Sequence, residues 1–131
     1  MIKSAENMIF VFGSNLSGYH GAGSARAAVK EHGAIYGQGE GLQGNSYALP
    51  TKGKNITHMS LERIAGYVKK FLQFASENPQ LDFQVTCVGC LRAGYSHSEI
   101  APLFKDAPSN CYFDTKWRPW LPETAKYWGT Y

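Results

Sequence analysis

The stretch that decides the fold is residues 8–33, which read MIFVFGSNLSGYHGAGSARAAVKEHG. It opens with five consecutive apolar residues and Gly13, a pattern typical of a parallel strand that is buried on both faces. A glycine-rich loop follows over residues 14–23. Residues 24–33 are rich in Ala and favour a helix that stops at Gly33. The order strand, glycine-rich loop, helix indicates one half of an α/β domain.

The same order recurs later in the chain. LDFQVTCVG, residues 81–89, predicts a second strand, and residues 90–95 form a second loop that contains glycine. Ser96 and Glu99 then match the S-x-x-E pattern of a capping box, which predicts the start of a helix. Pro102 lies within the first turns and weakens the expectation of a helix there.

The remaining segments predict further strands and one long helix. Short strands are expected near residues 34–36 and 46–49, joined by a flexible glycine-rich loop. Residues 60–77 give the clearest helix, with Ser60 as its N-cap. The aromatic tail that starts at residue 110 is expected to cover the core. Together these elements predict a single domain over residues 1–131, a three-layer α/β/α fold with a mixed, mostly parallel sheet.

Composition argues against several classes of protein. The chain has 131 residues, of which 44% are hydrophobic and 18% charged, a balance that argues against disorder. Its net charge is +3 with scattered Lys and Arg, so the basic patch of a nucleic-acid-binding protein is missing. The apolar runs are too short for a signal peptide or a membrane span, and three cysteines suit a reducing compartment. We therefore expect a cytoplasmic protein that does not contact a membrane.

The cysteine and histidine patterns do not predict a metal or a cofactor. Cys87 and Cys90 form a C-x-x-C pair at the end of the second predicted strand. Residues three apart on a strand point to opposite faces, so both are interpreted as small buried residues and not as a redox or zinc pair. No two histidines have the i, i+4 spacing of metal ligands on a helix.

The two loops carry the functional prediction. The first N–H groups of a helix have no partner and carry partial positive charge, and a glycine-rich approach lets the backbone close around an anion. Both loops should lie beyond the carboxyl ends of buried strands, where open α/β sheets bind ligands. A ligand that bears phosphate is therefore expected to contact both. The alternative is that the glycines serve only tight turns.

Four side chains near these loops are candidates for a role in binding or catalysis. Asn15 can hydrogen-bond to vicinal hydroxyls, or it can form a local Asx-turn. Arg92 can pair with a phosphate through two hydrogen bonds. His20 is a candidate ligand contact or acid–base group, or else a solvent-facing loop residue. Glu40 is the carboxylate within a glycine-rich loop and the candidate general base.

Three stretches resemble macro domains. FVFGSNLSGYHGAGSARAA, residues 10–28, resembles their first binding loop, and GEGLQGNSYALPTK, residues 39–52, resembles the segment that follows. VTCVGCLRAGYSHSEIA, residues 85–101, resembles their phosphate-facing loop, so the resemblance spans about residues 8–104. It does not extend to the acidic residue that reads adenine in macro domains, because Glu6 is the only acidic residue before the first strand.

The resemblance implies an ADP-ribose site. It places Asn15 beside the distal ribose, and it implies that the second loop holds the diphosphate and that Tyr95 covers the ribose. The predicted ligand-binding residues are Gly13, Ser14, Asn15, Gly21, Ala22, Gly23, Gly89, Cys90, Arg92, Ala93, Gly94 and Tyr95. If the protein is an enzyme, the predicted catalytic residues are Asn15, His20 and Glu40.

Three functions remain open at this point. The first is a module that binds ADP-ribose or a related nucleotide that bears phosphate. The second is a hydrolase that removes ADP-ribose from a modified protein or nucleic acid, or that cleaves a signal nucleotide. The third is a Rossmann-like nucleotide-binding protein that resembles the lysine-decarboxylase-like family.

Overall fold

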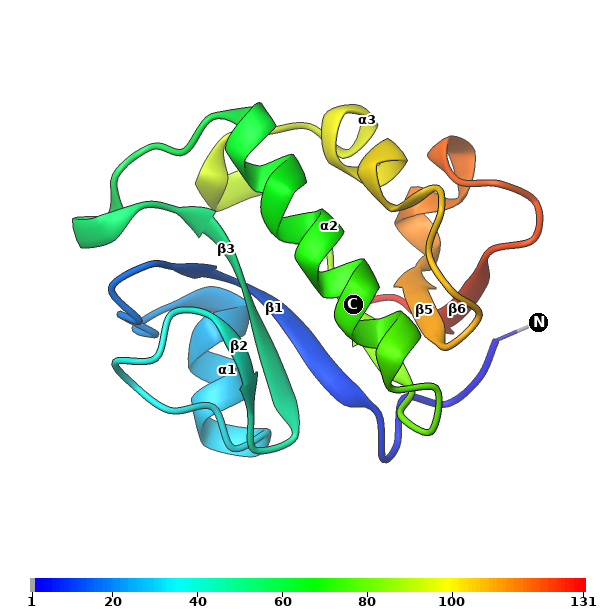
Figure 1. Cartoon of the computed structure of the whole chain (residues 1–131), viewed down its shortest axis with the longest axis horizontal. Coiled ribbons are helices and arrows are strands. Elements are labelled where there is room, and N and C mark those ends of the chain that lie inside the picture. The colour runs from blue at the N-terminus through cyan, green and yellow to red at the C-terminus, as the bar shows by residue number, and fades with distance from the viewer. Residues whose placement is uncertain (1) are drawn as a thin grey trace.

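The computed structural model describes residues 2–131 as one six-stranded sheet with helices on both faces (Figure 1). The strands lie in the order β2-β3-β1-β4-β5-β6. β2 and β3 pair in antiparallel fashion, and all other neighbours are parallel. The predicted three-layer α/β fold with a mixed, mostly parallel sheet is therefore confirmed.

The elements have the following bounds. The strands are β1 (Ile9–Asn15), β2 (Gly41–Gln43), β3 (Ser46–Lys52), β4 (Phe83–Val85), β5 (Cys111–Asp114) and β6 (Lys126–Gly129). The α-helices are α1 (Gly23–Glu31), α2 (Leu61–Glu77) and α3 (His97–Ile100). Four 3-10 helices complete the set: η1 (Lys54–Ile56), η2 (Leu91–Ala93), η3 (Ala101–Phe104) and η4 (Thr115–Trp120). Within residues 2–131, none of the helices is long and apolar enough to cross a membrane.

The apolar run of β1 is explained by its place in the middle of the sheet. Side chains alternate along a strand, so Phe10 and Phe12 pack with α1 on one face while Ile9 and Val11 join the larger core on the other. Figure 1 shows α2 in front of the sheet and α1 behind it. A strand that is covered in this way needs apolar residues at every position.

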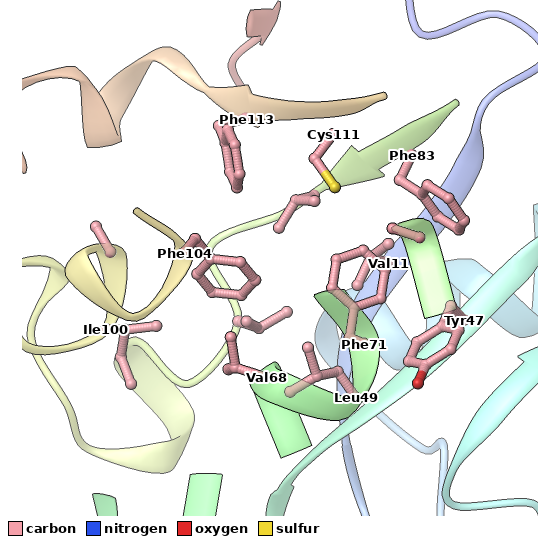
Figure 2. Close-up of a cluster of buried hydrophobic side chains, with 14 of the residues drawn as sticks. Val11, Tyr47, Leu49, Val68, Phe71, Phe83, Ile100, Phe104, Cys111 and Phe113 are labelled. Carbon is pink, nitrogen blue, oxygen red and sulfur yellow. The ribbon is translucent and has the colours of Figure 1, made fainter. Parts of the chain in front are cut away.

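The larger core lies between the sheet and α2. Side chains from α2, such as Val68 and Phe71, meet Val11, Leu49 and Phe83 from the strands (Figure 2). The predicted helix and its cap are confirmed, because the Ser60 hydroxyl accepts a hydrogen bond from the Arg63 N–H at 3.2 Å.

The aromatic tail covers the core, as predicted. Trp117 is fully buried and stacks at a tilt on Phe104 and Phe113. Tyr127 is buried beside them in the same core. Trp120 and Tyr131 remain exposed.

One predicted strand is absent, and another is shorter than predicted. Residues 34–36 do not form a strand, because the Ile35 N–H donates to the Gln43 side chain at 2.8 Å instead of to a neighbouring strand. The antiparallel partner of β3 is β2, within the stretch predicted as a flexible loop. The second predicted strand stops at Val85, where the Thr86 hydroxyl donates a hydrogen bond to the Val11 carbonyl at 2.7 Å and the chain turns away.

The early end of β4 also corrects the interpretation of the cysteines. Cys87 and Cys90 follow the strand and are half-buried, so they do not lie on opposite faces of a strand as predicted. The helix after the second loop begins with the predicted capping box of Ser96 and Glu99, but α3 has four residues and continues as η3, which begins at Ala101 and contains Pro102.

Burial of Cys111 predicts a loss of stability at alkaline pH. Burial raises the pKa of its thiol from 9.0 to about 12. Because the unfolded chain releases this proton first, the stabilisation is complete below pH 9.0 and is lost as pH rises toward 12. Over that interval the free energy of unfolding should fall by up to about 1.4 kcal/mol per pH unit from this group.

Urea unfolding of the wild type and of Cys111→Ala at about pH 8 and about pH 10 measures this contribution. The variant should lose less stability between the two values than the wild type does. An equal loss in both proteins would assign the alkaline effect to other groups, such as Tyr47, whose pKa burial also raises to about 12.

Candidate functional site

A cleft of about 650 Å³ opens where the parallel strands end. Residues at or just after the carboxyl ends of β1, β3, β4 and β5 line it together with the start of α1. Ten of the twelve predicted ligand-binding residues line this one cleft: Gly13, Ser14, Asn15, Gly21, Ala22, Gly23, Gly89, Cys90, Arg92 and Ala93. The two loops were predicted separately from two distant stretches, and the parallel pairing of β1 with β4 brings them together.

The start of α1 offers an environment for an anion. Ala22 occupies the N-cap position and provides no side-chain hydrogen bond, and the first turn contains no acidic residue. Gly23 has a φ of +61°, and a β-carbon added there would lie 3.0 Å from Nε of Arg92. The guanidinium group from the second loop therefore lies beside the helix start that the first loop forms. Free N–H groups, the helix dipole and this charge all favour an anion at the same point.

Asn15 adopts the local turn that was left open as an alternative. Its Nδ2 donates to the Tyr19 carbonyl at 3.0 Å, and its Oδ1 accepts from the Tyr19 N–H at 3.0 Å. The side chain is buried although the residue lines the cleft. Both ends of the amide are therefore engaged in shaping the first loop.

The glycine-rich stretch of residues 33–44, part of which was predicted as a flexible loop, supports the first loop from outside. The Ser14 hydroxyl donates to the Gly39 carbonyl, and the Gly37 N–H donates to the Gly18 carbonyl at 2.8 Å. At Gly39, a β-carbon would overlap the Asn15 carbonyl oxygen. The close approach of the two backbones therefore requires glycine at this position.

The other two catalytic candidates lie away from the cleft lining. His20 is buried and its Nε2 donates to the Gln38 carbonyl at 2.9 Å, since a carbonyl can only accept. Its Nδ1 meets no hydrogen-bond partner within residues 2–131. Glu40 reaches toward α2, where its carboxylate lies 3.5 Å from Nζ of Lys70. Of the three predicted catalytic residues, the structure places Asn15 alone on the cleft wall.

Gly94 and Tyr95 also lie outside the cleft lining. The Tyr95 hydroxyl donates to the Met59 carbonyl at 2.7 Å and lies 3.2 Å from Nε2 of His58. These contacts direct the ring toward the segment before α2. The second loop thus contributes to the cleft through Cys90, Arg92 and Ala93 and not through the predicted aromatic residue.

The sequence interpretation missed an acidic residue in the cleft. Asp114 ends β5, is 1% exposed and accepts the Lys116 N–H at 2.9 Å through Oδ1. Both residues line the cleft, as does Lys52 at the end of β3. The signal that could have found Asp114 is a polar residue directly after the apolar stretch CYF, at the carboxyl end of a strand.

The two thiols in the cleft are poor nucleophiles. Burial, together with the nearby Asp114 carboxylate, raises the pKa of Cys87 to about 12. Burial also raises the pKa of Cys90 to about 11. Both thiols are therefore protonated at neutral pH. No group of three or more His, Cys, Asp or Glu side chains within the described part of the chain could hold a metal ion.

The charges of the cleft are arranged along the carboxyl edge of the sheet. Lys52 ends β3, Arg92 follows β4, and Asp114 and Lys116 lie at the end of β5. Three cations therefore line the cleft together with one buried carboxylate, which favours a ligand with negative charge and a hydrogen-bond donor. Comparisons of the chain with protein-family models, with curated proteins and with solved structures give no match.

Proposed function

We propose that this protein binds ADP-ribose or a closely related nucleotide that bears phosphate. The observation that carries the proposal is the meeting of both glycine-containing loops at one cleft, with Arg92 beside the uncapped start of α1. Neither loop alone would distinguish a phosphate site from an ordinary turn. The volume of about 650 Å³ lies within the usual range for nucleotide-sized ligands.

The geometry supports a specific seating of the ligand. The phosphates would lie at the N–H groups of α1 and against the Arg92 guanidinium. Asp114 uses Oδ1 for the Lys116 N–H, which leaves Oδ2 to accept from an amino group on the ligand. Asp114 would then recognise the base, the role that an acidic residue before the first strand has in macro domains.

The proposal is binding and not hydrolysis. His20 and Glu40 lie outside the cleft lining, and Asn15 uses its side chain to shape the loop. Raised pKa values keep both thiols in the cleft protonated at neutral pH. The described residues of the cleft therefore favour holding a nucleotide over cleaving one.

Thermal unfolding with three ligands tests the proposal. ADP-ribose should raise the Tm more than AMP or ribose 5-phosphate does, because its diphosphate is long enough to contact both loops. At a concentration of about one hundred times the Kd, the stabilisation is about 2.7 kcal/mol, or about 10 °C for a domain of this size. Equal shifts with AMP and ADP-ribose would contradict a diphosphate site. No shift with any nucleotide would overturn the proposed function.

A further inference from the structure

Two exposed tyrosines stand together on the wall of the cleft. Tyr19 is 44% exposed and Tyr36 is 62% exposed, and both line the cleft. Their rings stack with centroids 6.1 Å apart and planes inclined by 26°. Neither ring belongs to the buried core clusters, so their position is not explained by packing of the fold. We name these two residues the tyrosine pair.

Contacts from Asn15 and His20 fix the position of the tyrosine pair. The Asn15 side chain binds the backbone of Tyr19 through two hydrogen bonds of 3.0 Å. The buried ring of His20 meets Tyr36 edge-on at 6.2 Å and meets Phe12 edge-on at 5.1 Å. A ring surface that is already ordered loses little conformational entropy when a ligand covers it.

The same end of the cleft carries a further apolar side chain under backbone strain. Ile56 lines the cleft, is 50% exposed and has a φ of +59°, a conformation that β-branched residues rarely adopt. The segment is tied to the first loop, since the Asn55 N–H donates to the Ser17 hydroxyl at 2.9 Å. Strain of this kind persists where the surroundings impose it, which is common at binding sites.

The order of the strands places the tyrosine pair opposite Asp114. Tyr19 follows β1 and Tyr36 precedes β2, whereas Asp114 ends β5 on the other side of β4. The anion position at Arg92 follows β4, between these two ends. Neighbouring strands lie about 4.8 Å apart, so β1 and β5 are separated by about 10 Å, the scale of a diphosphate with its sugars.

We infer that the tyrosine pair is a stacking platform for a second planar heterocycle, carried on the ribose at the end of the diphosphate away from Asp114. The inference rests on the proposed function, because it needs the phosphates seated beside Arg92. Aromatic side chains stack on the π-face of any base, so the platform selects for a planar ring and not for one base. The preferred ligand class is then a dinucleotide, with a ring at each end.

ADP-ribose and NAD⁺ form a matched pair of probes, because they differ by one planar ring on the distal ribose. Isothermal titration of the wild type should give NAD⁺ a Kd at least about 10-fold lower than that of ADP-ribose. NADH, whose nicotinamide ring carries no positive charge, serves as a third probe. Tighter binding of NADH than of ADP-ribose would show that stacking, and not the charge of the ring, supplies the gain.

Tyr36→Ala should raise the Kd for NAD⁺ about 10-fold and leave that for ADP-ribose within about 2-fold. Tyr36→Phe keeps the ring and should retain the wild-type ratio. The matched control is Tyr131→Ala, since Tyr131 is also exposed on the cleft but meets Trp128 of β6 edge-on. This control should leave the ratio of the two Kd values unchanged.

The outcomes separate the inference from the proposed function. If NAD⁺ binds no tighter than ADP-ribose in the wild type, or if Tyr36→Ala weakens both ligands equally, the platform is overturned and nucleotide binding stands. If neither ligand binds, both are overturned. Because Tyr36 is 62% exposed, its variants should melt at the wild-type temperature without ligand, and this melting curve is recorded with each titration.

Discussion

Gly23→Glu is expected to weaken ADP-ribose binding by at least about 100-fold while leaving a folded protein. The new carboxylate would lie at the start of α1, where the proposed phosphate site is, and it would pair with Arg92, whose Nε is 3.0 Å from the position of the added β-carbon. The φ of +61° adds a conformational cost of about 1 to 2 kcal/mol, which a domain of ordinary stability tolerates. Isothermal titration and a urea unfolding curve measure the two effects separately.

Gly94→Glu is the matched control for this experiment. Gly94 has a φ of +92°, so the substitution carries the same kind of backbone strain and the same added charge. A β-carbon there meets no atom within 4 Å, and the residue lies outside the cleft lining. The affinity of the Gly94→Glu variant for ADP-ribose should stay close to that of the wild type. An equal loss of affinity in both variants, or normal binding by Gly23→Glu, would contradict a phosphate site at the start of α1.

Gly39→Ala is expected to lower the free energy of unfolding by about 3 kcal/mol. The added β-carbon would overlap the carbonyl oxygens of Asn15 and Leu16, which are backbone atoms and cannot rotate away. The overlap would push residues 33–44 off the first loop and disturb the Ser14 hydrogen bond to the Gly39 carbonyl. Urea unfolding measures the loss, and the affinity for ADP-ribose should fall with it because the same loop lines the cleft.

Gly21→Ala, in the first loop that Gly39 contacts, provides the comparison. A β-carbon at Gly21 meets nothing within 4 Å, and its backbone is not in the left-handed region. The change in the free energy of unfolding should therefore stay within about 0.5 kcal/mol. If Gly39→Ala costs no more than Gly21→Ala, the contact between the two glycine-rich segments does not stabilise the loop.

Local patterns were sufficient for the elements that build the domain. The apolar residues 8–12 predicted a strand covered on both faces, and β1 lies in the middle of the sheet. The cap at Ser60 and the helical spacing after it predicted α2. Burial and capping depend on residues close in sequence, so they can be recognised before the fold is known. Pattern alone did not separate residues 34–36 from a strand, because three apolar or aromatic residues carry little periodic signal.

The composition of the cleft shows a mixed outcome. Ten of the twelve predicted ligand-binding residues line it, because each loop was recognised by its own glycine content after a buried strand. Tyr95 does not line the cleft, because its hydroxyl donates to the Met59 carbonyl. That partner is distant in sequence and cannot be predicted from a local pattern. Asp114 and Tyr36 also line the cleft. The sequence predicted only core packing for the segment of Asp114 and a strand for that of Tyr36.

The sequence by itself therefore determined the fold class, the central strand, the long helix and the two loops that meet at the cleft. Only the tertiary structure decided that Arg92 lies beside Gly23, that Asp114 lines the cleft and that Tyr19 stacks on Tyr36. The physical reason is that strand order and side-chain partners follow from contacts between distant segments. Those contacts are selected by the packing of the whole domain and leave no periodic pattern in any one stretch of sequence.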